Sequence, residues 1–292
     1  MYLDLKSLSC VDALARTLSF HRAARACALS PAAFGKRIRQ IEEQLDKELF
    51  SRTTRRVELT PDGARLLPKA RQLLASADGL LTEVRGEEPP IDLVIGTRHE
   101  LGMSWLLPAR KVLKSRLPHV TIHLAFGHRT DLESAVLALQ TDACVISRTP
   151  STTRLSAFDL HREDYAFVAS PQLLAEVAFA EPSDAEKHVL VDIDQSLSLY
   201  RYLRPEEGEL RFRSVLTMGT IDAIRTAVLG GEGVAMLPLY FIKQDLAAGR
   251  LLSILPNTAI ATDTFRLIFR SDDPQRDLMR RLADVLRGVA LR

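Results

Sequence analysis

The chain has 292 residues, of which 46% are hydrophobic and 26% charged, and its formal net charge at pH 7 is +2. These are the values of an ordinary globular protein of about two domains, and they exclude a disordered chain, a collagen-like fibre and a disulfide-stapled miniprotein. There is no run of roughly 18 apolar residues, and charged residues interrupt the first 30 positions, so we expect no membrane span, no signal peptide and a soluble cytoplasmic protein.

Charge is unevenly distributed along the chain. Residues 1–85 contain 15 Lys/Arg against 10 Asp/Glu, a net +5, whereas residues 86–292 contain 24 against 27, a net −3. A basic front part favours nucleic acid as a partner, although a modest excess of surface charge is commonly only solvated.

The first 50 residues predict three short helices. Ser19 is suited to cap the second helix, and Ser30 followed by Pro31 is a typical start for the third. Apolar residues recur at helical spacing along the first helix, at Leu5, Leu8, Val11, Ala15 and Leu18, and along the third, at Phe34, Ile38, Ile41 and Leu45.

The predicted outer face of the third helix carries small, basic and amide side chains, which is typical of a helix that enters the major groove of DNA. A hydroxyl- and arginine-rich turn between two short strands follows within 51–60 and is suited to phosphate contacts. The alternative is a plain three-helix bundle with a solvated outer face. The candidate DNA-binding residues are Ser30, Ala32, Ala33, Gly35, Lys36, Arg39, Arg52, Thr54, Arg55 and Arg56.

This pattern resembles the LysR-type family of bacterial transcriptional regulators. The resemblance rests on Leu5 through Phe20, Ala23-Ala24, Leu29-Ser30 with Arg39 through Leu45, and Glu48-Leu49-Phe50-Ser51-Arg52 running into Leu59-Thr60-Pro61-Asp62-Gly63. It implies an N-terminal winged helix-turn-helix, a long linker helix, and a C-terminal α/β two-lobed effector domain similar to periplasmic solute-binding proteins. The sequence departs from the family at Pro31, Ala32 and Gly35, so the usual Gln and Ser base contacts do not transfer.

Residues 60–85 form the longest helical pattern in the chain. Leu and Ala recur at close to a 3.5-residue period, which favours pairing with a second copy of the helix, although packing on its own domain is the alternative. We expect Pro68 to kink this helix. The candidate dimerisation residues are Leu66, Leu73, Leu74, Ala77 and Leu81.

From residue 91 the pattern changes to short apolar runs that alternate with helices. It predicts strands at Ile91–Ile95, Val120–Phe126 and Ala143–Ile146 and helices at Met103–Leu117 and Leu132–Leu139, an order that implies a parallel sheet covered by helices. A second set of strands begins near residue 155, and a further strand is predicted at Thr264–Phe269. The expected organisation is a winged helix-turn-helix at 1–59, a linker and dimerisation helix at 60–85, a hinge at 86–90, effector lobe I at 91–160 and 264–292, and effector lobe II at 161–263.

Ligands of parallel sheets bind beyond the carboxyl ends of the strands, next to helix N-termini. The resemblance to the LysR-type family implies that Thr97 and Thr220, at two such ends, belong to the effector pocket. The further candidate effector-binding residues at these ends are Arg98, His99, His128 and Arg148. Their positive charge favours an anionic small molecule. Alternatively the threonines are only helix caps, the arginines are solvated, and Glu100 neutralises Arg98.

Other motifs do not support catalysis or a metal. Gly230-Gly231-Glu232-Gly233 follows a helix and precedes a strand, so it predicts a helix C-cap rather than a phosphate loop. His119, His123 and His128 have no Cys or carboxylate partner in the pattern, and no nucleophile and base pair can be assigned. We therefore expect no catalytic residue, no metal and no cofactor.

The resulting hypothesis is a DNA-binding transcriptional regulator, not an enzyme, that associates with the nucleoid and with itself as a dimer and, by family resemblance, a tetramer. Its partners are double-stranded promoter DNA and a small, anionic effector, with no membrane. The family implies that the effector closes the lobes and changes the angle of the dimer on DNA. The rival is a two-lobed binding protein or enzyme whose front helices serve only for association.

Overall fold

The computed structural model describes residues 3–52, 57–85, 90–127, 129–194, 198–204 and 210–291. The chain forms two compact units. Unit 1 contains Met1–Arg98, Ala109–Asp159 and Arg266–Gly288, and unit 2 contains His99–Pro108, Leu160–Phe265 and Val289–Arg292. The units are defined by how the chain packs, so the functional domain boundaries stay predictions. Residues 99–108 pack with unit 2 rather than with the rest of 91–160.

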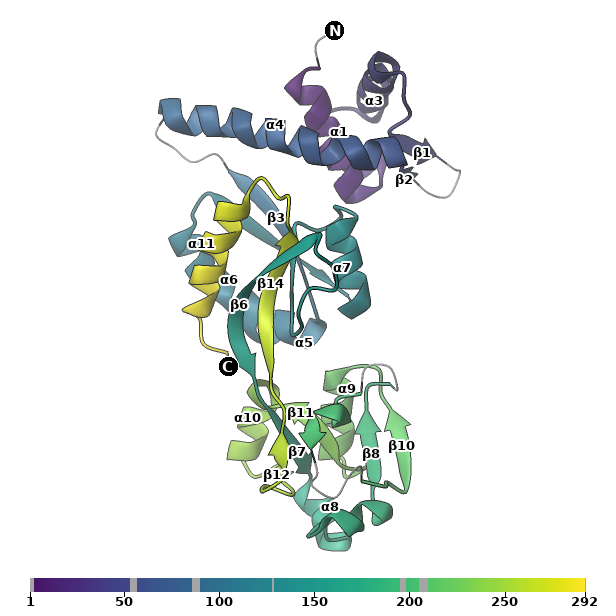
Figure 1. Ribbon diagram of the computed structural model, residues 1–292, viewed down its shortest axis with the longest axis vertical. Helices are drawn as coiled ribbons and strands as arrows, with labels where there is room; N and C mark the ends of the chain where they lie inside the picture. Colours follow the sequence, from purple (N-terminus) through teal and green to yellow (C-terminus); the bar gives the residue numbers. More distant parts are fainter. Residues whose placement is uncertain are drawn as a thin grey trace. The chain divides into compact units, whose positions relative to one another are not determined.

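Unit 1 begins with the predicted helical region. The Ser19 and Ser30 side chains cap the second and third helices as expected, and Ala28 has a φ of 51° in the joint between these helices. In chain order the elements are α1 (Leu5–Thr17), α2 (Phe20–Ala26), α3 (Pro31–Leu45), β1 (Phe50–Arg52), β2 (Val57–Leu59) and α4 (Pro61–Arg85) (Figure 1). The two strands pair antiparallel.

The core of this region is built from the inner faces of α1, α3 and α4. Two predicted core positions differ, because Leu5 lies in the first turn of α1 and is 47% exposed, and Leu18 ends that helix in a left-handed conformation. The predicted residues that are buried are Leu8, Val11, Ala15, Phe34, Ile38 and Ile41.

Gly63 lets the start of α4 approach the backbone just before β1. A Cβ at this position would lie 2.2 Å from the carbonyl oxygen of Leu49, so only glycine allows this close approach. The Thr60 hydroxyl donates to the Glu48 carbonyl at 2.6 Å and accepts from the Gly63 N–H at 3.0 Å. The Thr60 hydroxyl therefore joins the backbone at the start of the long helix to the backbone just before the hairpin.

The main sheet has the strand order β4-β3-β5-β14-β6. The first three strands are parallel, as predicted, and β14 runs antiparallel to β5. Figure 1 shows α7 on one side of this sheet and α6 and α11 on the other. The elements are β3 (Ile91–Thr97), α6 (Leu107–Arg116), β4 (Val120–Phe126), α7 (Arg129–Leu137), β5 (Ala143–Ile146), β6 (Leu155–Glu163), β14 (Asp263–Arg270) and α11 (Arg276–Arg287).

Unit 2 has a central strand, β7, that pairs antiparallel with β11 and β12. Strand β8 pairs parallel with β10. The elements are α5 (His99–Leu101), η1 (Gly102–Leu106), β7 (Tyr165–Ala169), α8 (Pro171–Glu176), η2 (Pro182–Lys187), β8 (Val189–Asp192), η3 (Tyr200–Tyr202), β9 (Leu203–Arg204), β10 (Ser214–Thr217), α9 (Ile221–Leu229), β11 (Ala235–Pro238), α10 (Leu239–Ala247), β12 (Leu252–Ser253) and β13 (Ala259–Ile260).

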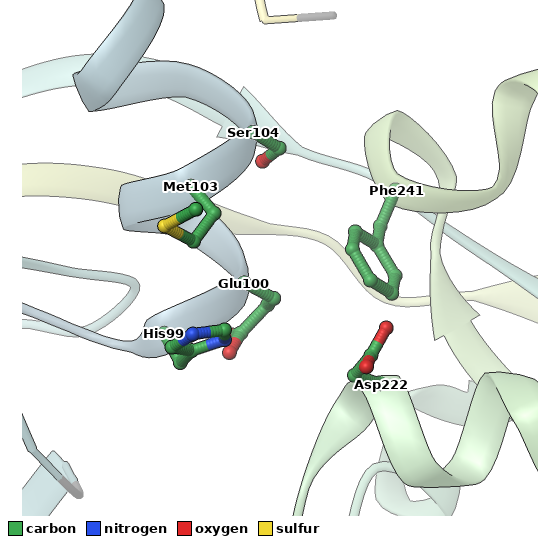
Figure 2. Close-up of a pocket in the computed structure, with 6 residues that line it drawn as sticks. All are labelled: His99, Glu100, Met103, Ser104, Asp222 and Phe241. Atoms are coloured by element: carbon green, nitrogen blue, oxygen red, sulfur yellow. The ribbon is translucent and has the colours of Figure 1, made fainter.

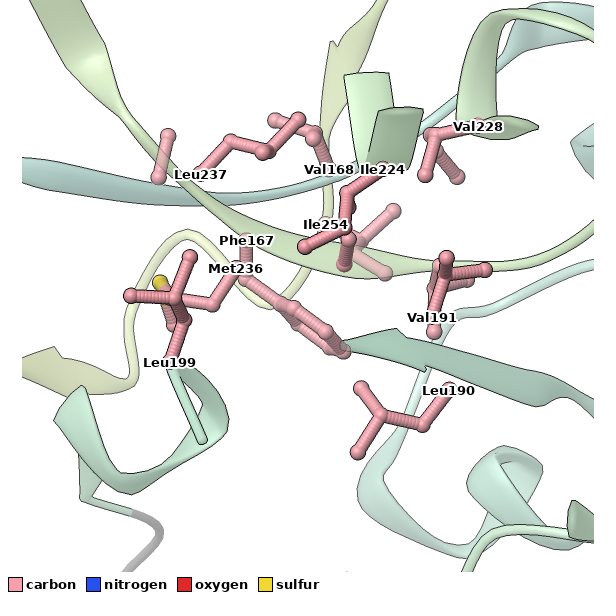
Figure 3. Packing of buried hydrophobic residues seen from close by; sticks show 14 of the residues in the cluster. Phe167, Val168, Leu190, Val191, Leu199, Ile224, Val228, Met236, Leu237 and Ile254 are labelled. Carbon is pink, nitrogen blue, oxygen red and sulfur yellow. The ribbon is translucent and has the colours of Figure 1, made fainter. Parts of the chain in front are cut away.

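The core of unit 2 lies between these strands and α9. Figure 3 shows Phe167 and Val168 of β7, Val191 of β8, Ile224 of α9 and Leu237 of β11 packed together. All five are at most 1% exposed. This core holds α9 in place, and with it the side chains of its first turn.

The glycine run after α9 is a helix end, as predicted: α9 stops at Gly230, and Gly231 has a φ of 80° before the chain enters β11. Within the described ranges, none of the helices combines the length and the apolar character that a membrane crossing requires.

Candidate nucleic-acid interface and ligand pocket

The outer face of α3 is the candidate DNA-reading surface. Ser30 accepts a hydrogen bond from the Ala33 N–H at 3.2 Å, which fixes the start of the helix. Lys36 and Arg39 are exposed one turn apart on this face, as are Ala32 and Ala33, while the opposite face is buried in the core. Gly35 is half-buried, and a Cβ there would meet no atom within 4 Å.

Arg37 has a structural role that sequence reasoning missed. Its guanidinium lies 3.2 Å from the carboxylate of Asp4, the residue that caps α1, and a hydrogen bond from the Ser7 hydroxyl holds the pKa of Asp4 below its usual range. The pairing ties α3 to α1. Arg37 is therefore held at the side of α3, which leaves Lys36 and Arg39 as the basic side chains of the outer face.

The hairpin after α3 is anchored by Glu42. Its Oε1 accepts the N–H groups of Leu49 at 3.0 Å and Phe50 at 3.2 Å, so α3 and the start of β1 are joined directly. The predicted phosphate contacts Thr54, Arg55 and Arg56 lie outside the described residues, as does the side chain of Arg52. Their role in DNA binding stays a prediction.

The long helix α4 has an inner and an outer apolar face. Leu66 and Leu74, two predicted dimerisation residues, pack partly against the core of their own domain. Leu73 is 53% exposed, and Leu80 and Val84, which the prediction omitted, are 64% and 83% exposed. Ala77 is half-buried, and the side chain of Leu81 lies outside the described residues.

The predicted effector residues are divided between the two units. Thr97 is fully buried and donates to the Val145 carbonyl at 3.5 Å, while Thr220 caps α9 by accepting from the Ala223 N–H. The Arg148 Nε lies 3.8 Å from a carboxylate oxygen of the buried Glu133. Of the three other candidates, Arg98 is half-buried, His99 is exposed and His128 lies outside the described residues.

A cavity of about 240 Å³ lies within unit 2. One predicted effector residue, His99, lines it, and two acidic residues that the prediction did not include, Glu100 and Asp222, line it as well. Each acidic residue lies in the first turn of a helix, a sequence signal that could have identified it. The lining residues, shown in Figure 2, are His99, Glu100, Met103, Ser104, Asp222 and Phe241.

The helical wall of the cavity is held by the chain's single tryptophan, Trp105, which follows Ser104 in η1. Its indole Nε1–H donates to the Val289 carbonyl at 2.9 Å, and its ring stacks on Phe265 with a centroid distance of 6.5 Å and meets His161 edge-on at 5.2 Å. Trp105 is 1% exposed. This packing fixes where the cavity-lining side chains of η1 project.

On the opposite wall, Asp245 holds the arginine next to Phe241. Arg225 donates to both Asp245 oxygens, at 2.6 and 2.9 Å, and its guanidinium carbon lies 5.8 Å from the centre of the Phe241 ring. Burial would raise the pKa of Asp245, but hydrogen bonds from Arg225 and Arg250 outweigh it and lower that pKa. The side chain of Asp245 is therefore a charged anchor for α9 and α10.

Comparison with known families matches both parts of the chain. The family described as the bacterial regulatory helix-turn-helix protein of the lysR family matches residues 5–64. The LysR substrate binding domain matches residues 87–290. The relatives are regulators, so the rival interpretation of the front helices as a mere association module, attached to an enzyme or binding protein, is wrong.

Individual relatives and structures agree with this. The transcriptional regulator CrgA of Neisseria meningitidis serogroup C is 26% identical over 264 residues, 87% of this chain and 86% of that protein. A full-length OxyR variant from Pseudomonas aeruginosa is 18% identical with a TM-score of 0.74 and covers 100% of this chain and 97% of its own. ArgP from Mycobacterium tuberculosis is 18% identical with a TM-score of 0.72, over 98% of this chain and 97% of its own. The chain belongs to the LysR-type family of DNA-binding transcriptional regulators, with an N-terminal helix-turn-helix and a C-terminal effector-binding domain.

Proposed function

We propose that the protein reads promoter DNA with the outer face of α3, and that Lys36 and Arg39 are the side chains that reach the bases. The observation that carries this proposal is the division of α3 into a buried inner face and an exposed outer face with these two cations one turn apart. Lysine and arginine donate well to guanine in the major groove. The hairpin arginines Arg52, Arg55 and Arg56 then contact phosphates.

The test is a set of anisotropy titrations with the full-length protein, using a duplex that the protein selects from a random pool and a scrambled duplex. Lys36→Ala should weaken binding to the selected duplex by about 1–3 kcal/mol and to the scrambled duplex much less. Lys111→Ala, an exposed lysine of α6, is the matched control. Equal losses on both duplexes would show that Lys36 contacts only phosphate.

The hairpin requires its own measurement. Replacing Arg52, Arg55 and Arg56 together with Ala should weaken binding to both duplexes and flatten the dependence of log affinity on log salt, because fewer counterions are released. A salt dependence equal to that of the parent protein would remove the hairpin from the interface.

We propose further that two copies pair through the outer apolar stripe of α4. Leu73, Ala77, Leu80 and Val84 follow one another at intervals of four, three and four residues, which is the spacing of a helix-pairing seam. Two-fold pairing suits a helix-turn-helix protein, which reads two half-sites. A tetramer and an association with the nucleoid remain predictions from family resemblance.

The C-terminal domain then takes a small effector in the cavity of unit 2, and effector binding shifts the population of DNA-binding states. The sequence predicts an anion, on the basis of Arg98, Arg148 and the helix ends. The cavity itself is lined by Glu100 and Asp222, and Arg148 faces Glu133 instead. The charge of the effector is therefore the property that a binding experiment has to settle first.

A further inference from the structure

The charged side chains that line the cavity are mainly acidic. Glu100 and Asp222 contribute carboxylates, whereas no Lys or Arg is among the described residues that line it. The volume of about 240 Å³ lies below the roughly 300–1,000 Å³ that is usual for drug-sized ligands, so the occupant is small. The remaining lining side chains are two polar and two apolar ones, His99, Ser104, Met103 and Phe241.

The two carboxylates lie on opposite walls. Figure 2 shows Glu100 on the helical wall and Asp222 across from it, with the Asp222 carboxylate directed toward the Phe241 ring. Glu100 is only 7% exposed. Water screens the charge of the buried Glu100 less than that of the exposed Asp222, so a cation between the walls is attracted by both carboxylates and more strongly by Glu100.

The two helix N-termini at the cavity, whose positive dipole ends favoured an anion, already carry an acidic side chain in their first turns. Glu100 lies in the first turn of the helix that begins at His99, and Asp222 lies in the first turn of α9. An acidic residue in the first turn interacts favourably with the positive end of the helix dipole. An anionic ligand would therefore meet two carboxylates before it met the helix ends.

The nearby arginine does not reverse this balance. Arg225 lies close enough to Asp222 to attract it, but both of its hydrogen bonds in this region go to Asp245. Asp245 is 1% exposed and holds Arg225 from the side of α10. Arg225 is thus directed toward Asp245, which also accepts from Arg250, and Asp222 remains a lining carboxylate of the cavity.

We propose that the cavity binds a small molecule with a positively charged nitrogen, an ammonium or a guanidinium group, between Glu100 and Asp222. An apolar stem of the ligand lies along Met103 and the Phe241 ring, whose face also favours a cation. This inference rests on the proposed function, because it takes the cavity to be the effector site.

The experiment uses the full-length protein and three probes with the same five-carbon chain: pentylammonium, pentan-1-ol and pentanoate at pH 7. Calorimetry measures the affinity of each probe. The fluorescence of Trp105 reports whether the probe binds at the cavity, because this residue is the single tryptophan of the chain and follows the cavity-lining Ser104. We expect pentylammonium to bind, pentan-1-ol to bind more weakly, and pentanoate to bind least. Agmatine then tests the guanidinium in the same way.

Two variants assign the site. Glu100→Gln and Asp222→Asn should each weaken binding of pentylammonium by about ten- to a hundredfold, the effect of losing one charge-assisted hydrogen bond. Asp222 is exposed, so its variant keeps the assay interpretable if the buried Glu100 variant folds poorly. Glu176→Gln, an exposed carboxylate of α8 outside the cavity, is the matched control and should bind as the parent does.

The proposal is overturned if pentanoate binds more tightly than pentylammonium, if Asp222→Asn binds the amine as tightly as the parent, or if none of the probes binds at millimolar concentration. The same protein samples are titrated with the selected duplex. Retained DNA binding with no amine binding refutes the cationic site alone. Amine binding without any DNA binding refutes the proposed DNA-reading function and leaves the cationic site standing.

Discussion

Four charged side chains within unit 1 join the helical region to the main sheet, and they allow a quantitative test. Arg16 of α1 donates to Asp12 at 2.9 Å and to Asp142, just before β5, at 2.7 Å. Arg71 of α4 bonds the other Asp12 oxygen and donates to the Leu139 carbonyl at 3.0 Å. The Asp142 carboxylate also accepts the backbone N–H of Val94, at 2.8 Å.

Asp142→Ala should destabilise the protein by about 3 kcal/mol. The change removes a charge-assisted hydrogen bond from Arg16, worth about 1.5–3 kcal/mol, and leaves the Val94 N–H without its side-chain acceptor, at about 1 kcal/mol more. Side-chain exposures of 26% for Arg16 and 7% for Asp142 place the pair among partly buried ones, whose disruption is costly.

The assay is urea unfolding of the parent, Asp142→Ala, Arg16→Ala and the double variant. The double-mutant cycle should return a coupling free energy of about 1.5–3 kcal/mol between the two side chains. The matched control is Arg162→Ala, because Arg162 pairs with Asp164 at 2.6 Å but with exposures of 69% and 42%. That exposed pair should contribute about 0–1 kcal/mol. A coupling near zero for Arg16 and Asp142 would refute the contact between α1 and the sheet.

The same network determines how stability responds to acid. Burial by itself would raise the pKa of Asp12, but the positive charges of Arg71 and Arg16 outweigh it and hold the pKa below its usual value. A carboxyl group whose pKa is lower in the folded state stabilises that state above its unfolded pKa, about 3.9 for Asp. The free energy of unfolding should fall as the pH drops below about 4, and Asp12→Asn should reduce this dependence.

Two further predictions concern α4. Leu80→Asp or Leu73→Asp should separate the dimer in sedimentation experiments, because each would bury a charge in the apolar seam. The control Gln72→Asp lies about 100° around the helix from Leu73 and should leave the dimer intact. An unaltered oligomer in both leucine variants would rule out the seam. Gly63→Ala should lower thermal stability by about 1–3 kcal/mol because its Cβ would collide with backbone, and Gly79→Ala, with no atom within 4 Å of its Cβ, should raise stability by about 0.5–1 kcal/mol. Equal melting temperatures for both glycine variants would contradict the close packing at the start of α4.

The helical region could be predicted because its signals are local. Ser30 before Pro31 specifies where α3 begins regardless of distant contacts, and the cap is formed as expected. The direction of β14 could not be predicted in this way, because it does not depend on local residues. Its apolar run predicts a strand, but whether that strand runs parallel or antiparallel to β5 depends on where the chain returns after unit 2, which no local pattern records.

The burial of Thr97 illustrates a limit of arguing from strand ends. A threonine at the carboxyl end of a parallel strand is suited to a ligand, yet this one is fully buried and its hydroxyl lies beside the Val145 carbonyl of the neighbouring strand. A hydroxyl can be satisfied by its own sheet as readily as by a ligand. The residue type is therefore compatible with both roles, and only the pairing of β3 with β5 shows that this hydroxyl lies beside a carbonyl group.

The cavity depends on a helical irregularity that periodicity does not reveal. The pattern predicts a helix from Met103 to Leu117, but the structure begins it at His99 and includes the π-helix η1. The extra residue of a π turn rotates the following side chains by about 100° relative to an α-helix. Trp105 is thereby buried while Met103 remains 47% exposed at the cavity. Asp222 and the rest of the opposite wall come from a distant part of the chain, so no local pattern shows that they line the same cavity. The basic residues at the strand ends predicted an anionic effector, whereas the acidic residues in the helical turns that follow line the cavity.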